Sequence, residues 1–226
     1  MDLIETIRTT GAVREFTDEP VDHGIIRAVL DSARFAPSGG NRQPWRVIVI
    51  DDDETRRGVR DAYLDAWHDY VAHVLAGLVP FSPLATSSER LNATALRDQA
   101  VATSRPTGFA ETLDQVPALL VVCADLSAFA ATDQDLDRYH FIGGASIYPF
   151  VWNVLLAART YGLAGVITTV ATRNESRLRT LLRIPPTHAV AAVVALGYPR
   201  RQPSRLTRRS VDSFATIDTF DGLMLE

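Results

Sequence analysis

The sequence predicts one domain of the α/β or α+β class, in which helices flank a single central sheet. Apolar segments of strand length alternate with segments whose apolar residues recur at helical spacing, and this alternation defines the class. A length of 226 residues suits one well-packed core with an inserted flap. The sequence shows no internal repeat and no linker to a second domain, so we expect one domain spanning residues 1–226.

The individual elements follow from apolar periodicity and from residues that begin or end helices. Asp22 and Asn174 are expected to cap helices, and Gly162 and the pair Pro185–Pro186 to end them. Helices are expected at Asp2–Thr10, from Asp22 to about Pro37, and at Asp53–His73, Tyr139–Tyr161 and Glu175–Leu182. Strands are expected at Arg46–Ile50, Leu119–Cys123, Val166–Thr169 and Ala189–Leu196.

Two segments lack a clear pattern. Between Gly77 and Gly108 only a short helix at Ser88–Ala102 is expected, and a long irregular segment of this kind is often a functional flap. We place this flap or insert around residues 74–110. The tail, residues 200–226, holds little core material and is expected to pack on a partner subunit.

Composition and charge are those of an ordinary globular protein. Hydrophobic residues make up 46%, charged residues 22% and the net charge is −4, which argues against nucleic acid or an anionic membrane as a partner. Residues Phe141–Ala158 carry no charge and reach the length of a membrane span, but they contain glycines, a proline and an asparagine. We interpret them as a buried helix at a subunit interface. The N-terminal residues do not resemble a secretory signal, so a cytoplasmic location is expected.

Several catalytic classes lack their residues. All 23 positively charged residues are arginine, so neither a lysine Schiff base nor a P-loop is available. The glycine fingerprint of Rossmann proteins and the serine elbow of hydrolases are also missing from the sequence. Cys123, the one cysteine, lies in an apolar strand, where we interpret it as a small hydrophobic residue.

No metal site is expected. His68 and His73 lie five residues apart on a helix, which places them about 140° apart around its axis, too far to share a metal ion. Asp133–Asp137 begins like a calcium loop, but Arg138 stands at the sixth position and Gly144 at the twelfth. We interpret this segment as a solvated acidic turn.

The run Ala36–Trp45 predicts a cofactor cradle. It lies between an amphipathic helix and an apolar strand, and its adjacent glycines let the backbone approach a flat or phosphorylated ligand. Asn41 and Gln43 offer side-chain amides to such a ligand. Arg14 and Arg208 are ordinary surface arginines when considered alone, but beside this cradle they favour a phosphate or a planar anionic edge.

Five motifs follow one another along nearly the whole chain. They are Ile7–Val21, Ala36–Trp45, Gly143–Pro149, Gly162–Thr169, and Leu196–Pro199 with Leu206–Arg209 beyond it. With these motifs in this order the chain resembles the FMN-dependent nitroreductase family, and Ala36–Trp45 is the most specific match. The resemblance implies an α+β nitroreductase-like fold, with a mostly antiparallel sheet flanked by helices, in an intertwined homodimer. Two FMN sites would lie at the interface, with Phe141–Ala158 in the dimer core and the tail around the partner.

The resemblance also implies roles for individual residues. Arg14 would face the N1/O2 edge of the flavin, where a positive charge raises the reduction potential. Arg208 matches the tail arginine that binds the phosphate. The other implied cofactor-binding positions are Pro37, Ser38 and Gly39 against the ring from the second subunit, Asn41 and Gln43 on the flavin or bracing the loop, Ser146 and Ile147 beside the ring, and Thr168 and Thr169 near the pyrimidine and N5 side.

The chain departs from the family pattern at residues that the resemblance implies lie near the FMN phosphate and near flavin N5. Thr10, Gly11 and Ala12 stand where members often have two arginines and a serine, so Arg8, Arg209 or backbone amides would have to substitute. Val170 stands where deiodinase-like members have a threonine near N5, which favours two-electron chemistry. Those members also bind an amino acid with a glutamate and a tyrosine, and Trp67 and Val71 occupy these places, so a deiodinase is not expected.

These observations predict an FMN-dependent NAD(P)H oxidoreductase that reduces nitroaromatic, quinone or enone acceptors by ping-pong two-electron transfer. No acid or base side chain is expected to be catalytic, because the chemistry occurs at flavin N5. Trp67 and Tyr70, with residues of the flap, are the expected acceptor wall, although aromatic residues there equally suit packing. Two alternatives stay open: a flavin-dependent dehydrogenase or oxidase of biosynthesis, and an FMN-binding or storage protein without turnover.

Overall fold

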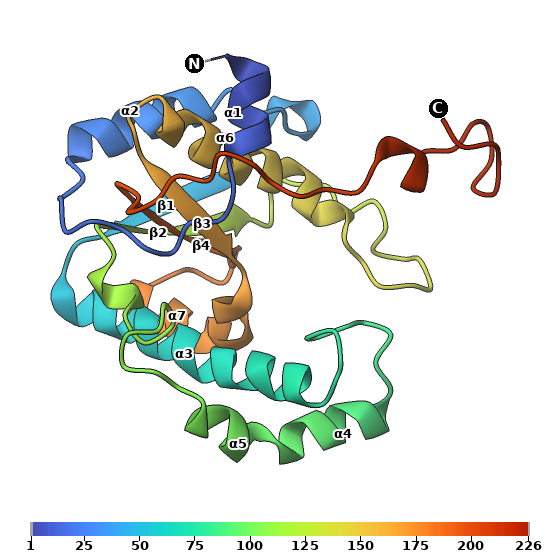
Figure 1. Ribbon diagram of the computed structural model, residues 1–226, viewed down its shortest axis with the longest axis horizontal. Coiled ribbons are helices and arrows are strands. Elements are labelled where there is room, and N and C mark those ends of the chain that lie inside the picture. The colour runs from blue at the N-terminus through green and yellow to red at the C-terminus, as the bar shows by residue number, and fades with distance from the viewer. Residues whose placement is uncertain (1, 226) are drawn as a thin grey trace.

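A four-stranded antiparallel sheet forms the centre of the computed structural model, which describes residues 2–225 (Figure 1). The strand order is β1-β2-β4-β3, and each neighbouring pair is antiparallel. The strands are β1 (Trp45–Ile50), β2 (Ala118–Asp125), β3 (Ala164–Thr168) and β4 (His188–Gly197). These bounds lie within two residues of the predicted strands, and the α+β class with an antiparallel sheet is confirmed.

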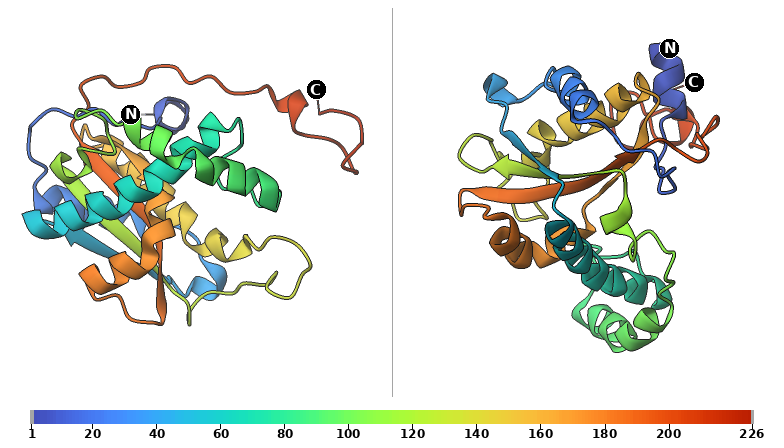
Figure 2. Two further views of the ribbon diagram at one scale, coloured as in Figure 1. Left: turned by 90° about the horizontal axis from the view of Figure 1, so that it is seen from below. Right: turned by 90° about the vertical axis from the view of Figure 1, so that its left-hand side faces the viewer.

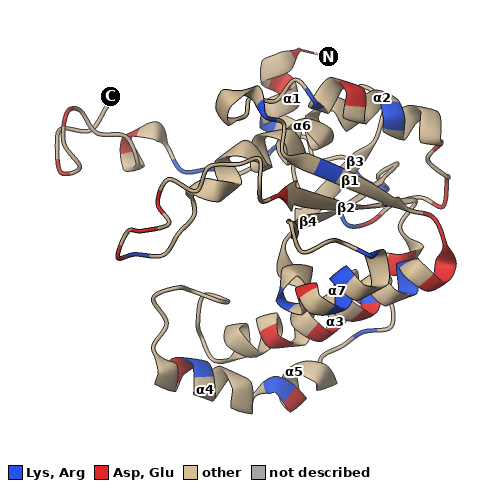
Figure 3. Ribbon diagram, turned by 180° about the vertical axis from the view of Figure 1, so that it is seen from behind, with Lys and Arg blue, Asp and Glu red and all other residues tan. Residues whose placement is uncertain are grey.

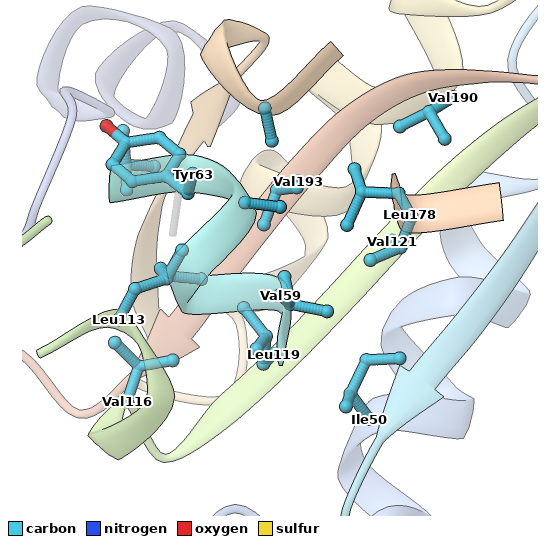
Figure 4. Packing of buried hydrophobic residues seen from close by; sticks show 14 of the residues in the cluster. Ile50, Val59, Tyr63, Leu113, Val116, Leu119, Val121, Leu178, Val190 and Val193 are labelled. Carbon is cyan, nitrogen blue, oxygen red and sulfur yellow. The ribbon is translucent and has the colours of Figure 1, made fainter. Parts of the chain in front are cut away.

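Helices cover both faces of the sheet, as the right-hand view of Figure 2 shows. One face carries α2 (His23–Ala33) and α6 (Tyr148–Arg159), and the other carries α3 (Asp53–Leu75) and α7 (Glu175–Leu182). Alternate residues of β2 therefore enter two separate cores. Leu119 and Val121 pack with α3 and α7 (Figure 4), whereas Leu120 packs with α2 and α6. This double coverage explains why β2 has a continuous apolar sequence.

The remaining helices lie at the periphery: α1 (Leu3–Thr9), α4 (Ser87–Ala95) and α5 (Arg97–Ala102). Short 3₁₀ segments occur at η1 (Gly39–Asn41), η2 (Leu113–Gln115), η3 (Ile142–Ser146), η4 (Val170–Asn174) and η5 (Val211–Ser213). Among residues 2–225, no helix has the length and apolar character needed to cross a bilayer.

Two helix predictions need correction. The helix expected at Tyr139–Tyr161 begins only at Tyr148, because the preceding Gly143–Gly144 segment forms the 3₁₀ turn η3 instead. Pro149 lies in the first turn of α6, where its missing N–H costs no hydrogen bond. Asp22 caps α2 by accepting from the Gly24 N–H at 2.6 Å, as predicted, but Asn174 does not cap α7. Its amide donates to the Ala62 carbonyl oxygen at 2.8 Å and so ties η4 to α3.

The flap contains two helices where one short helix was expected. Leu96 separates α4 from α5, and both helices lie outside α3, on the side away from the sheet (Figure 1). Thr86 and Glu89 form a reciprocal capping box at the start of α4. The guanidinium of Arg97 donates to Asp69 of α3 at 2.7 Å and also contacts Asp65. The flap is thus held against α3 by charge-assisted hydrogen bonds.

Residues 126–147 form an arm that projects from the sheet before α6 (Figure 1). The structure corrects the prediction of a solvated acidic turn here, because the Asp133 side chain is buried. Its Oδ2 accepts from the Arg138 guanidinium at 2.8 Å, from the Phe141 N–H at 2.9 Å and from the Ile142 N–H at 3.3 Å. Burial alone would raise the pKa of Asp133, but these hydrogen bonds outweigh it and lower the pKa to about 2.

The tail leaves the body of the domain as an extended segment, as Figure 1 and the left-hand view of Figure 2 show. Near its end it folds back on itself, where the Ile217 N–H donates to the Leu223 carbonyl oxygen at 2.8 Å. Its large apolar side chains are exposed: Val211, Phe214, Ile217, Phe220, Leu223, Met224 and Leu225. Within the single chain the tail therefore has almost no core to bury them.

Candidate functional site

The loop between α2 and β1 has an unusual backbone. Gly40, Asn41 and Gln43 adopt positive φ angles of 60°, 54° and 51°. Such conformations are uncommon for residues other than glycine and cost of order 1 kcal/mol or more each, so they persist only where the surroundings fix them. We call residues 37–43 the cradle loop.

Hydrogen bonds hold the cradle loop in this conformation. The Gln43 N–H donates to the Ser38 hydroxyl at 2.9 Å, and the Gln43 side-chain amide donates to Asn41 Oδ1 at 3.2 Å. The Gly39 N–H donates to the hydroxyl of Ser146, which lies just before α6, at 3.1 Å. Pro37, Gly39, Asn41 and Gln43 remain exposed. The loop thus presents a rigid, polar backbone surface to a ligand.

Packing beneath the loop fixes its position on the domain. The ring of Trp45, the first residue of β1, stacks on Phe150 of α6 with centroids 4.8 Å apart and planes within 5°. Ile147 is buried in the same core. The structure therefore brings Ser38, Gly39 and Ser146 together, whereas the Ile147 side chain is not on the exposed surface.

A second group of predicted residues lies at the β3 edge of the sheet. The segment that carries Arg14 runs beside β3, because the Val13 N–H donates to the Gly165 carbonyl oxygen at 2.9 Å. Thr168 ends β3, and its hydroxyl lies close enough to Tyr63 of α3 to influence the pKa of that phenol. Burial raises the pKa of Tyr63, although Thr168 and the charge of Arg14 act in the opposite direction. Tyr63 was not predicted as a site residue, because in the sequence it looks like one more core aromatic.

Arg14 faces a small cavity of about 170 Å³ that Tyr63, Trp67 and Phe109 also line. Its guanidinium carbon lies 5.9 Å from the centroid of the Phe109 ring. Trp67 lines this cavity, whereas Tyr70 does not. The two rings stack on each other along α3, with centroids 4.8 Å apart. Thr169 lies beyond Thr168 and is exposed.

Arginine side chains line a third region, a cavity of about 690 Å³ between α1, α6 and the tail. Arg8, Arg205 and Arg208 all line it, together with Thr10 and Trp152. Of the two arginines suggested as substitutes, only Arg8 lines this cavity; Arg209 does not. Arg205 was not predicted, although it lies on the tail three residues before Arg208.

The structure gives a physical reason for the altered phosphate motif. A Cβ atom on Gly11 would lie 2.8 Å from Cδ2 of Leu206, so the tail fills the space that a longer side chain would need. Thr10 follows the last residue of α1, and its hydroxyl donates its proton to the Thr6 carbonyl oxygen at 2.7 Å, so this proton is not available to a ligand in the cavity. Positive charge in this region therefore comes from α1 and from the tail rather than from residues 10–12.

The cradle loop and the Arg14 group lie at opposite edges of the sheet. The cradle loop leads into β1, Thr168 ends β3, and two strands separate β1 from β3. Three inter-strand steps of about 4.8 Å place these edges about 14 Å apart. The single chain therefore carries two separate groups of predicted cofactor residues.

Two further predictions concern metals and the cysteine. Between residues 2 and 225, no group of three or more histidine, cysteine, aspartate or glutamate side chains is placed to hold a metal ion. The Cys123 thiol is buried in β2, and desolvation raises its pKa to about 11. This burial confirms the interpretation of Cys123 as a core residue, which in this state is an unreactive thiol.

Comparison with known proteins shows which family the chain belongs to. A family model described as the nitroreductase family matches residues 7–198. An NADH dehydrogenase of Thermus thermophilus is 31% identical over 191 residues, which cover 84% of this chain and 83% of that protein. A nitrobenzene nitroreductase of Ectopseudomonas oleovorans is 27% identical, covering 94% and 95%.

A solved structure supports the same fold. The structure of oxidised iodotyrosine deiodinase bound to FMN and 3-iodo-L-tyrosine superimposes with a TM-score of 0.66 at 20% identity, and covers 97% of this chain and all of that one. Together with the family model and the relatives, this result identifies the fold as nitroreductase-like. The chain belongs to the nitroreductase family and is an oxidoreductase enzyme.

Proposed function

We propose that this protein is an FMN-dependent NAD(P)H oxidoreductase that reduces nitroaromatic, quinone or related electrophilic acceptors by ping-pong two-electron transfer. The observation that carries the proposal is the cradle loop, whose positive φ angles at Gly40, Asn41 and Gln43 form a rigid exposed surface. The names of the relatives, an NADH dehydrogenase and a nitrobenzene nitroreductase, support the same donor and acceptor classes. We also retain the prediction of a cytoplasmic location.

The described residues fit FMN at both of its ends. Gly39 is exposed, so the cradle loop would offer its backbone to the ring system, with the exposed amides of Asn41 and Gln43 beside it. The cavity lined by Arg8, Arg205 and Arg208 supplies positive charge for a phosphate. Arg8 and Arg205 would supply the positive charge that many family members obtain from two arginines among the positions of Thr10, Gly11 and Ala12. These residues support FMN better than a neutral flat ligand.

When bound, FMN supplies hydride acceptance from NAD(P)H and delivery of two electrons to the acceptor. For a nitro acceptor the balance is NAD(P)H, one proton and R–NO₂ giving NAD(P)⁺, R–NO and water. Arg14 would place a positive charge at the N1/O2 edge, where negative charge develops, and would thereby favour reduction. Thr168 and Thr169 would hold the flavin near N5, and Trp67 and Tyr70 would shield the reacting groups from water. Alignment by these side chains replaces a catalytic acid or base.

We further propose that the functional unit is a homodimer in which the cradle loop of one protomer serves the FMN of its partner. The separation of the cradle loop from Arg14 and Thr168 supports this arrangement, because a second protomer supplies the missing half of each site. Exposed apolar surface supports it too. The tail residues have no core of their own, and Leu3, Ile4 and Ile7 of α1 and Trp152 of α6 are also exposed. A stable dimer would bury these side chains.

The test is stoichiometric binding of FMN to the purified protein, with arginine variants as a probe of the phosphate site. We expect one FMN per chain, and about tenfold weaker FMN binding by Arg208→Gln, since a charge-assisted hydrogen bond contributes about 1.5 kcal/mol or more. Arg209→Gln is the matched control, because Arg209 does not line the cavity. No FMN binding by the wild-type protein would refute the proposal, and equal losses in the two variants would refute the phosphate assignment.

A further inference from the structure

A cavity of about 750 Å³ lies between the C-terminal half of α3, α4 of the flap and η4. Its volume is in the range of pockets that hold substrate-sized ligands. It is separate from the smaller cavity that Arg14 and Trp67 line. Of the predicted cofactor residues only Thr169 contributes to its wall, and neither Trp67 nor Tyr70 lines it. On the proposed function, on which this inference rests, an occupant here would lie beside the N5 side of the flavin.

Two arginines from different elements line this cavity. Arg90 projects from α4 and Arg173 from η4, and neither guanidinium forms an ion pair with any residue between 2 and 225. Asp69 is the one carboxylate among the described lining residues, and Arg97 already binds it at 2.7 Å. The cavity wall is therefore positive, although the chain as a whole carries a net charge of −4. Figure 3 shows one acidic and one basic segment side by side on α4, which are Glu89 and Arg90, and of these only Arg90 lines the cavity.

The walls of the cavity are aromatic. The guanidinium carbon of Arg173 lies 5.0 Å from the centroid of the Phe81 ring, which orients its side chain. The ring of His73 lies 4.8 Å from the same Phe81 ring, and Tyr139 of the arm lines the cavity as well. His73 Nδ1 donates to the Asp69 carbonyl oxygen at 2.8 Å, so the histidine serves as a fixed flat wall. A conjugated ligand has flat surfaces to stack against on these side chains.

We infer that this cavity selects acceptors that combine an aromatic or conjugated body with a carboxylate, and that Arg90 and Arg173 bind the carboxylate. Isolated surface arginines seldom bind anything specific. Here two guanidinium groups from different elements converge on one concave, aromatic-walled surface, and no carboxylate within the described residues neutralises them. The acceptor's reducible group would then point toward Thr169 and the flavin. Neutral acceptors lack the contact with both arginines and bind less tightly.

The test compares two acceptors of nearly equal shape, 4-nitrobenzoate and 4-nitrobenzamide, which differ in charge. Affinity for the oxidised FMN-loaded protein is measured by calorimetry, and kcat/KM is measured with NADH as the donor. The wild-type protein should favour the carboxylate about tenfold in both measurements. In Arg90→Gln and in Arg173→Gln this ratio should fall toward one. Arg177→Gln is the control, because Arg177 pairs with Asp61 outside the cavity, and its ratio should stay that of the wild type.

A wild-type ratio near one would overturn the inference and leave the proposed oxidoreductase function intact. Failure of the FMN-loaded protein to reduce either compound would instead refute the proposed function, and the calorimetric ratio would still decide the question of the anion site. NADPH carries a 2′-phosphate that NADH lacks, and this group is a second candidate anionic ligand for the two arginines. KM for NADPH and KM for NADH are therefore compared in the same variants. If the two substitutions raise KM for NADPH alone and leave the nitrobenzoate ratio unchanged, the arginines bind the donor and our assignment is wrong.

Discussion

Arg14 is the residue that we expect to set the potential of the flavin. It lies beside Thr168 and Tyr63 at the β3 edge, where it faces the small cavity. Replacing it with glutamine should lower the two-electron potential by roughly 30 mV for each 1.4 kcal/mol of lost charge stabilisation. The measurement is an anaerobic reductive titration against a reference dye, with elution volume as the check on assembly. An unchanged potential in a correctly assembled variant would refute this role.

Cys123 is a second residue whose behaviour follows from its surroundings. Burial raises its pKa to about 11, so almost no thiolate exists at pH 8, and the strand shields the sulfur from reagents. The folded protein should not react with a thiol reagent at pH 8 over an hour, whereas the unfolded protein should show one thiol per chain. Labelling of one thiol per folded chain would contradict the prediction, because it would show that a reagent reaches the Cys123 sulfur in β2.

At the scale of elements, the sequence predicts well those segments whose pattern is local. Strands β1 to β4 and helices α2 and α7 lie where periodicity and Asp22 place them, because the sheet and its two helical layers bury the side chains that create the pattern. Three features were not predicted. The donation by Asn174 to the Ala62 carbonyl oxygen of α3 depends on a contact distant in the sequence. The burial of Asp133 and the late start of α6 at Tyr148 depend on the folded conformation of the arm and of the Gly143–Gly144 turn, which apolar periodicity does not describe.

The same distinction applies to the candidate site. The cradle loop and the tail arginine are recognisable from their motifs, but the positive φ angle at Gln43 and the contact of Gly39 with Ser146 are not. Arg205 and Arg173 resemble any other surface arginine in the sequence. Only the folded chain shows that each lines a cavity with other arginines. The motifs therefore single out the cradle loop and Arg208, whereas the cavity-lining positions of Arg205 and Arg173 are found only in the folded chain.

The arm should depend on Asp133. The pKa of Asp133 is lowered to about 2 in the folded chain from an ordinary value of 3.8, so its stabilising effect is fully present above about pH 4. This effect is lost as the pH falls toward 2, because protonation removes the charge that Arg138 and the backbone N–H groups bind. At neutral pH, Asp133→Asn should have the same consequence. It weakens the contact with Arg138, which is already exposed, and so loosens the backbone around Arg138 that trypsin must bind in an extended conformation.

Limited trypsin digestion checks this prediction at pH 8. Because the chain has no lysine, trypsin cleaves only after arginine, and cleavage after Arg138 should be several-fold faster in Asp133→Asn than in the wild type. Asp135→Asn is the control, since Asp135 is exposed in the same arm. Equal cleavage rates in the three proteins would mean that the buried carboxylate does not hold the arm.

At the scale of the whole molecule, the tail should hold two protomers together. Phe214 is 62% exposed and Phe220 is fully exposed within one chain, so each has a large apolar surface available for a partner. Replacing both with aspartate should shift the protein to a monomer in sedimentation and should weaken FMN binding, because each site would lose the partner's cradle loop. Leu84→Asp is the control, since Leu84 is 90% exposed in the flap. A dimer of unchanged stability that still binds FMN would contradict a role of the tail in assembly.

The central claim, an FMN-dependent oxidoreductase that works by two successive half-reactions, is tested most directly by anaerobic stopped-flow measurement of the FMN-loaded protein. We expect NADH or NADPH to bleach the flavin absorbance with one equivalent per FMN. We expect nitrobenzene, added after the donor is exhausted, to restore that absorbance. Steady-state rates should then give parallel double-reciprocal lines, as ping-pong kinetics require. Loaded protein whose flavin absorbance neither nicotinamide bleaches would contradict the account.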